Sequence, residues 1–343
     1  MLTWTDQPYA TMWAHLRVLS HVNNAKRLLL NQLGGKRKAA PRAEQLLDKK
    51  AAQLSYCVLQ ADEYFRAAES VSINTSPLLY FYGMLSLAKA TVVANDPQKL
   101  LDDVKYHGLH HDKLQRAAIV EDQLALVNGG VFDELMNLVL GYRVPKGSAF
   151  RFRDVLAISP ELSDMYERYF ATSPRWIYFY SQDLTSKDPY GLKVCVVAKD
   201  EQRVLSALPE LAQDFERQPG LLHGQAICFL PKASVEETPN YFRVYTPVVG
   251  GRYLVGSLKY SLNGSIQTRY ISPPVSDYIL MYILSDCVRY QQELWGNVVQ
   301  GRETGILGVI ELAIAIAKRR FPNTALNELF GEPFEYGAPS RMM

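Results

Sequence analysis

The densest group of ionisable side chains in this sequence is a short histidine-rich segment. It contains His107, His110 and His111, and Asp112 follows at once. Imidazole groups can bind a transition metal, bind an anion or transfer protons near neutral pH. The spacing does not match an H-x-x-x-H or H-E-x-x-H helix. The segment therefore predicts either a polar loop in which His107 bonds to the backbone, or a phosphate or substrate site, rather than a metal site.

Arg289 is notable because it interrupts an apolar helix face. The apolar neighbours on that segment are Met281, Leu284, Cys287, Val288, Leu294 and Trp295. A buried guanidinium without a partner is costly, so Arg289 needs a carboxylate or an anionic ligand. Asp286 lies three residues before it and Glu293 four residues after it, both within reach on a helix. A structural ion pair and an anion-binding site both stay open.

Lys89 raises the same question in an earlier helix. It lies in the segment 78–94, which is apolar on almost every side. Its long stem can also carry the ammonium group to the surface. Tyr82 is another amphipathic residue of that segment, and Trp295 follows Arg289 on the later helix. The predicted ligand-binding residues are His107, His110, Lys89, Arg289, Tyr82 and Trp295.

Motifs that combine catalytic groups at a defined spacing are absent from the sequence. Gly301 and Gly305 lack the Lys-Ser/Thr of a phosphate-binding loop, no G-x-S-x-G elbow occurs, and no cysteine has a histidine beside it. We therefore predict no catalytic residue, metal or cofactor. The sequence favours a binding or interaction protein over an enzyme, without deciding the matter.

The four cysteines predict a reducing environment. Cys57, Cys195, Cys228 and Cys287 are far apart, without C-x-x-C spacing, and lie among apolar residues. Free cysteine behaves as a small buried apolar side chain. The first ten residues carry Asp6 and Pro8 rather than a signal segment, and no run reaches the roughly 18 apolar residues of a membrane span. We expect a cytoplasmic protein with no membrane association.

The overall charge gives no reason to expect a highly charged partner. The chain has 343 residues, and 37 basic and 35 acidic side chains leave a formal charge of +2. This balance argues against nucleic acid as a partner, although Lys36, Arg37, Lys38 and Arg42 form a basic stretch. A protein partner or a small anionic ligand fits better, and self-association stays open. The 21 tyrosines favour a cleft or core edge at which each hydroxyl finds a partner.

The order of expected elements predicts an α+β fold. Residues 1–174 form an N-terminal helical block, residues 175–272 a β-rich middle block, residues 273–331 a C-terminal helical block and residues 332–343 a surface tail. Within these blocks we expect helices at 10–33, 41–70, 76–94, 204–218, 275–300 and 304–320. Asn263-Gly264 predicts a hairpin in a mostly antiparallel sheet, and Phe321-Pro322-Asn323 predicts a helix end. The two helical blocks are expected to pack together around the middle segment.

Segments spread in order along the chain resemble the YaaC-like family. They are Ser76 to Met84 with Leu87 to Ala90, His107 to Leu109, Asn128 to Phe132, Ile158 to Leu162, Arg289-Tyr290 with Trp295, and Phe321 to Asn323 with Asn327 to Leu329. The resemblance implies a family of largely uncharacterised bacterial proteins. It therefore transfers a fold class and no mechanism.

A looser similarity links the helix containing Tyr82 and Lys89 to HEPN-type helical bundles, some of which cleave RNA. Those nucleases use an Arg and a His separated by four to six residues, whereas Arg17 and His21 are separated by three. The leading hypothesis is a non-catalytic interaction or ligand-binding protein. The alternative is a HEPN-like nuclease or hydrolase, or an effector of a stress or anti-phage defence system.

Overall fold

The computed structural model describes eight stretches of the chain: 2–32, 41–111, 118–178, 194–219, 226–232, 242–245, 253–302 and 305–337. The basic run Lys36 to Lys38 lies outside the described residues. Within the described residues the fold is α+β, as expected from the sequence.

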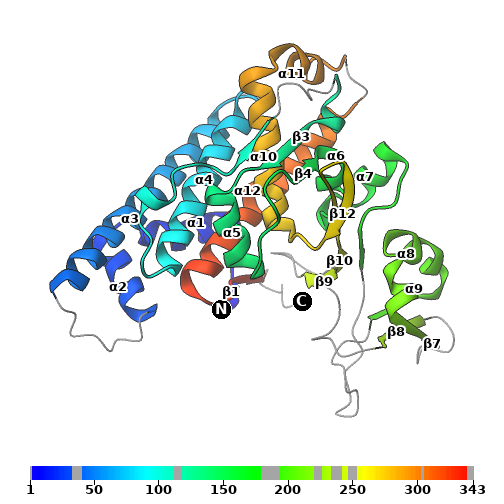
Figure 1. Cartoon of the computed structure of the whole chain (residues 1–343), viewed down its shortest axis with the longest axis horizontal. Coiled ribbons are helices and arrows are strands. Elements are labelled where there is room, and N and C mark those ends of the chain that lie inside the picture. Colours follow the sequence, from blue (N-terminus) through cyan, green and yellow to red (C-terminus); the bar gives the residue numbers. More distant parts are fainter. Residues whose placement is uncertain are drawn as a thin grey trace.

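One helix, α4 (Ser76–Asn95), forms the centre of a helical bundle (Figure 1). It packs against helices from both ends of the chain: α3 (Pro41–Ser70), α5 (Gly130–Leu140), α10 (Pro273–Tyr290) and α12 (Leu307–Phe330). The bundle is completed by α1 (Pro8–Val18) and α2 (Val22–Gln32), and by α11 (Gln292–Val299), which follows α10. The two predicted helical blocks therefore pack together and share one core.

The composition of α4 explains its central position. Pro77 occupies the first turn, where the missing N–H costs nothing, and apolar side chains follow on all sides. Among the described residues, α4 is the one helix with the length and composition of a membrane span, although the sequence predicted none. In that stretch 72% is buried inside the protein, so the apolar residues serve the core.

A five-stranded antiparallel sheet covers one side of the bundle, with strand order β12-β11-β4-β3-β2. Its strands are β2 (Leu109–His110), β3 (Leu124–Val127), β4 (Ala149–Arg151), β11 (Leu258–Leu262) and β12 (Ser265–Arg269). The pairing of Ser261 with Ala149 joins strands from both sides of residue 175. Short helices α6 (Phe152–Leu156) and α7 (Ser163–Phe170) follow β4 in the chain.

A small block with its own hydrophobic core lies at one side of the bundle (Figure 1). Its sheet has the order β6-β8-β7, and its helices are α8 and α9. The bounds are β6 (Val194–Val197), α8 (Glu201–Ala207), α9 (Glu210–Asp214), β7 (Phe215–Pro219) and β8 (Ala226–Pro231). A third sheet, with the order β5-β10-β9, comprises β5 (Trp176–Tyr178), β9 (Phe242–Tyr245) and β10 (Tyr253–Gly256). Ile177 of β5 contributes to the core of the small block.

The expectation that all four cysteines are free is wrong for two of them. Cys195 and Cys228 form a disulfide, because the antiparallel register of β6 and β8 places them directly opposite each other. Cys57 and Cys287 are free and buried, as expected. The sequence separation of 33 residues concealed the pair, since only the strand register brings it together.

Several predicted element boundaries differ from the structure. The helix expected at 10–33 is two helices, because the backbone turns at Leu19 to His21. The helix expected at 204–218 ends early: Pro209 separates α8 from α9, and β7 follows. The expected break at Pro322 is absent, and α12 continues to Phe330. The helix expected at 275–300 divides at Gln291 into α10 and α11.

The two termini meet in a short parallel pair of strands. Residues of β1 (Leu2–Trp4) pair with β13 (Glu335–Gly337), within the segment expected to be a surface tail. Phe334 and Tyr336 are both buried. Up to residue 337, this segment thus contributes to the core and does not form a surface tail.

Candidate functional site

Two helices that are far apart in sequence bring two of the predicted residues, Tyr82 and Arg289, together. Tyr82 and Lys89 lie two turns apart on α4, and Arg289 lies in the last turn of α10. Because α4 packs directly against α10, the Arg289 guanidinium reaches the Tyr82 hydroxyl, with Nη1 and Oη 3.5 Å apart. The separation in sequence is 207 residues, so only tertiary packing creates this contact.

His107 reaches the same place from the loop that precedes β2. The Tyr278 hydroxyl donates to the carbonyl oxygen of His107 at 2.8 Å. The imidazole ring lies between aromatic residues, with ring centroids 5.3 Å from Tyr282 and 5.9 Å from Phe81. These contacts hold the ring against α4 and α10 and leave it half-buried.

The hydrogen bond at Nδ1 determines which tautomer the neutral His107 ring adopts. The backbone N–H of Leu109 donates to His107 Nδ1 at 3.3 Å, so Nδ1 acts as the acceptor. In the neutral ring Nε2 then carries the hydrogen and is the donor. Burial, followed by the positive charges of Arg289 and Lys89, lowers the pKa of His107 from its ordinary value. The lowered pKa favours the neutral form of His107, in which Nε2 is a hydrogen-bond donor.

Arg289 does not form the ion pair that one interpretation of the sequence expected. Among the described residues, its guanidinium donates to neutral oxygens: the Ser285 carbonyl at 3.1 Å, the Ser285 hydroxyl at 3.4 Å and the Tyr82 hydroxyl. The guanidinium carbon also lies 4.9 Å from the centroid of the Tyr290 ring. Throughout the described part of the chain, neither Asp286 nor Glu293 forms a salt bridge with Arg289.

The Asp286 carboxylate has other partners. The Gln291 side chain donates to its carboxylate at 3.3 Å, and His111 Nδ1 lies 4.0 Å from the same oxygen. The His111 side chain is buried, and its Nε2 has no hydrogen-bond partner among the described residues. His111 was not among the predicted ligand-binding residues, since its position beside His110 gave no sign of its burial. The Asp286 carboxylate is thus already bonded.

Lys89 is half-buried and has no ion pair or hydrogen bond with any described residue. Its positive charge lowers the pKa of His107. It also lowers the pKa of the Cys57 thiol, against the larger effect of burial. Burial raises the pKa of the Cys57 thiol to about 12, which keeps that cysteine protonated and unreactive. We call Lys89, Arg289 and His107 the cationic cluster.

Two other predicted residues occupy different settings. His110 is exposed on β2, and its charge also lowers the pKa of His107. Trp295 is buried on α11, and its indole N–H donates to the carbonyl oxygen of Asn74 at 3.3 Å. That bond attaches α11 to the loop before α4. Among the described contacts, none brings Trp295 to the cationic cluster.

The arginine considered for RNA cleavage has a structural partner. Arg17 Nε and Nη2 both donate to one carboxylate oxygen of Asp62, at 3.0 and 2.8 Å. Asp62 is buried and also pairs with Arg66 at 3.1 Å. The guanidinium of Arg17 thus joins α1 to α3. Within the residues that the structure describes, no group of His, Cys, Asp and Glu side chains forms a candidate metal site.

The comparisons with known proteins give one match. A family model described as YaaC-like Protein matches residues 17–329, which include the central bundle and the cationic cluster. No curated protein and no solved structure matches the chain.

Proposed function

The chain belongs to the YaaC-like protein family, and we propose that it is a non-catalytic ligand-binding protein whose cationic cluster holds a small anionic ligand. The proposal is supported by Arg289, which reaches Tyr82 near the His107 ring, and by Lys89, whose positive charge, with that of Arg289, lowers the pKa of His107. Neither cation pairs with a carboxylate of the described residues. Paired cations serve structure, whereas two unpaired cations at one place favour an anion.

The donors at the cluster suit an oxyanion. Arg289 supplies a planar fork of N–H groups, and its present bonds, at 3.1 to 3.5 Å, go to neutral oxygens. Lys89 supplies an ammonium group with no partner among the described residues, and neutral His107 supplies Nε2–H. Charge-assisted bonds from Arg and Lys to an oxyanion are stronger than bonds between neutral groups.

The surroundings of the cluster increase the strength of such bonds. Tyr82, Tyr282 and Phe81 place aromatic rings around the imidazole and the guanidinium. Partial exclusion of water lowers the local dielectric constant and strengthens each electrostatic contact. Tyr82 also stacks on Tyr64, with centroids 5.7 Å apart, which fixes its hydroxyl near Arg289.

Binding of inorganic phosphate provides the test. We expect phosphate to bind the wild-type chain, as measured by calorimetry and by NMR shifts of His107. Arg289→Gln and Lys89→Met should each weaken binding at least about tenfold, since a bond to a charged group contributes about 1.5–3 kcal/mol. Arg302→Gln is the matched control, because Arg302 is exposed and lies outside the cluster.

The outcomes separate clearly. Weaker binding in both cluster variants, with the control unchanged, supports the proposal. Absence of phosphate binding to the wild type, or equal binding by all variants, overturns it.

The nuclease alternative predicts a different result in a different assay. A nuclease that uses these residues cleaves RNA and loses that activity in His107→Ala and Arg289→Ala. A non-catalytic binding protein leaves RNA intact in the wild type and in both variants. Cleavage by the wild type that is lost in the two variants would replace the binding proposal with the enzymatic one.

A further inference from the structure

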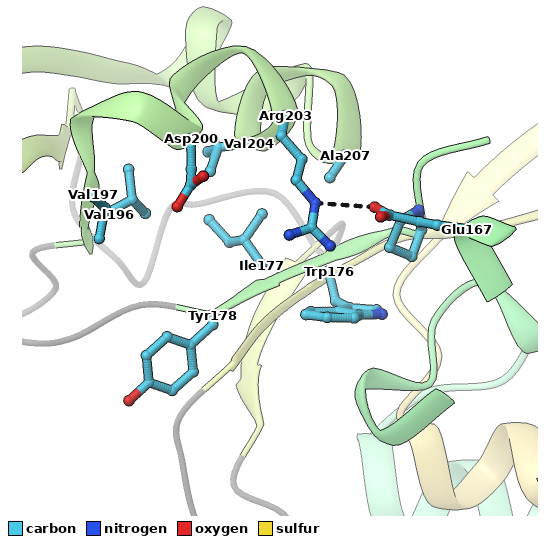
Figure 2. A pocket seen from close by; sticks show the side chains of 11 residues that line it. Glu167, Trp176, Ile177, Tyr178, Val196, Val197, Asp200, Arg203, Val204 and Ala207 are labelled. Carbon is cyan, nitrogen blue, oxygen red and sulfur yellow. Dashed lines mark hydrogen bonds and ion pairs between the residues drawn. The ribbon is translucent and has the colours of Figure 1, made fainter. Parts of the chain in front are cut away.

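A cavity of about 130 Å³ lies between β6 and α8 of the small block on one side and α7 and β5 on the other (Figure 2). None of its lining residues belongs to the cationic cluster. Its apolar lining comes from β5, β6 and α8: Trp176, Ile177, Val196, Val204 and Ala207. By the same measure a single water needs about 10–15 Å³, so the cavity has room for about ten waters. Spaces between two packed units are common sites for small ligands.

Two arginines hold the walls of this cavity together. Arg203 of α8 donates from Nε to a Glu167 carboxylate oxygen of α7 at 3.0 Å, across the rim (Figure 2). Arg175, which precedes β5, donates to the Ala207 carbonyl at 3.0 Å and pairs with Glu210. These bonds hold the elements that line the cavity in place.

The charges at the rim do not balance. Glu167 and Asp200 are negative and Arg203 is positive, and Arg203 is already paired with Glu167. Asp200 is half-buried and makes no ion pair or side-chain hydrogen bond with the rest of the described chain. Figure 2 shows Asp200 and Arg203 projecting from the small block toward Ile177. The rim thus presents one uncompensated carboxylate above an apolar floor.

We infer that this cavity binds a small organic cation, an amine with an apolar body. The apolar body packs on Ile177 and Val204, and the ammonium group pairs with Asp200. An anion is disfavoured because Arg203, the guanidinium among the described lining residues, is neutralised by Glu167.

Three probes of similar size and different charge test the inference: phenethylamine, phenethyl alcohol and hydrocinnamate. We expect phenethylamine to bind most tightly, by at least about tenfold, or 1.4 kcal/mol, over the other two. The readout is the indole N–H signal of Trp176 in NMR spectra, assigned by its loss in Trp176→Phe. A shift of this signal places the probe in the cavity.

Two substitutions at the rim have opposite expected effects. Asp200→Asn removes the uncompensated carboxylate and should weaken phenethylamine binding about tenfold. Arg203→Gln frees the Glu167 carboxylate to pair with the ligand, so it should tighten phenethylamine binding several-fold. The matched control Asp6→Asn alters an exposed carboxylate between β1 and α1 and should leave binding unchanged.

The following results would overturn the inference: no shift of the Trp176 signal with phenethylamine, equal binding of the three probes, or unchanged affinity in Asp200→Asn. Phosphate binding at the cationic cluster is measured at His107, so failure of either site leaves the other test intact.

Discussion

Gly108 lies so close to Gly129 that a Cβ atom at position 108 would be 2.0 Å from the carbonyl oxygen of Gly129. Gly108 also has a φ of +91°, which disfavours any other residue. The contact is continued by hydrogen bonds: Asn128 N–H donates to Gly108 O, and Val131 N–H donates to Tyr106 O, both at 2.8 Å. The backbone that carries His107 is thus clamped to the turn that begins α5.

Gly108→Ala is therefore expected to destabilise the protein strongly. The backbone conformation and the clash with Gly129 act together, and we expect a loss of more than about 3 kcal/mol of unfolding free energy. Gly141→Ala is the matched control, with a φ of +78° and no atom within 4 Å of the added Cβ. It should cost about 1–2 kcal/mol, from backbone strain alone. Equal losses in a denaturant titration would refute the proposed close contact.

The pKa of His107 should respond to its two cationic neighbours. Burial, Arg289 and Lys89 lower it, so removal of either charge should raise it toward the ordinary value. NMR titration of the His107 ring protons in the wild type, Lys89→Met and Arg289→Gln measures the change, with Arg302→Gln as the control. If neither cluster variant moves the pKa, the charges do not converge on His107.

His107 also makes the free energy of unfolding depend on pH. Because the pKa of His107 is lower in the folded state, the unfolded chain binds more protons below about pH 6.5. The stability that His107 contributes is present above that pH and is lost as the pH falls through the folded-state pKa. His107→Gln should flatten this part of the stability profile. A profile that is equally steep in the variant would contradict the expectation.

The buried pair Arg320–Asp277 should be far more important to stability than a surface pair. Arg320 donates to both oxygens of Asp277, at 2.7 and 2.6 Å, and to Glu161 at 2.7 Å. Asp277→Asn should cost about 3–5 kcal/mol, because it leaves the guanidinium without its main partner in the core. The double variant Asp277→Leu with Arg320→Met should cost less than the sum of its single changes.

The surface pair provides the comparison for this prediction. Arg217 pairs with Glu201 at 2.6 Å in an exposed position. Arg217→Met is expected to change stability little, because solvent screens exposed ion pairs. Similar effects at the buried and exposed positions in urea titrations would argue against a structural role for Arg320.

The disulfide Cys195–Cys228 should be detectable by thiol counting. The unfolded, unreduced chain should expose two thiols, those of Cys57 and Cys287, and four after reduction. In the chain-entropy model, a disulfide that closes a loop of 33 residues stabilises the fold by about 3–4 kcal/mol. Reduction should therefore destabilise the small block. The variant Cys195→Ser with Cys228→Ser should show no further response to reductant. Four thiols without reduction would show that the bond does not form.

Local chemistry predicted those elements in which one effect dominates. The central position of α4 followed from its apolar composition on all sides, and the hairpin of β11 and β12 followed from Asn263-Gly264, whose φ values are +50° and +78°. Pro322 was misleading because tertiary packing outweighs the loss of one helix hydrogen bond: Arg320 and Asn323, on either side, are both bonded within the core. Propensity is a weak guide where packing is dense.

The sequence by itself determined the composition of the bundle helices, the residue types available for binding and the family to which the chain belongs. The tertiary structure alone decided which of those residues meet. Arg289 meets Tyr82 because α4 packs on α10, and Cys195 meets Cys228 because of a strand register. Such contacts depend on the relative placement of elements that are remote in sequence, which local patterns do not encode.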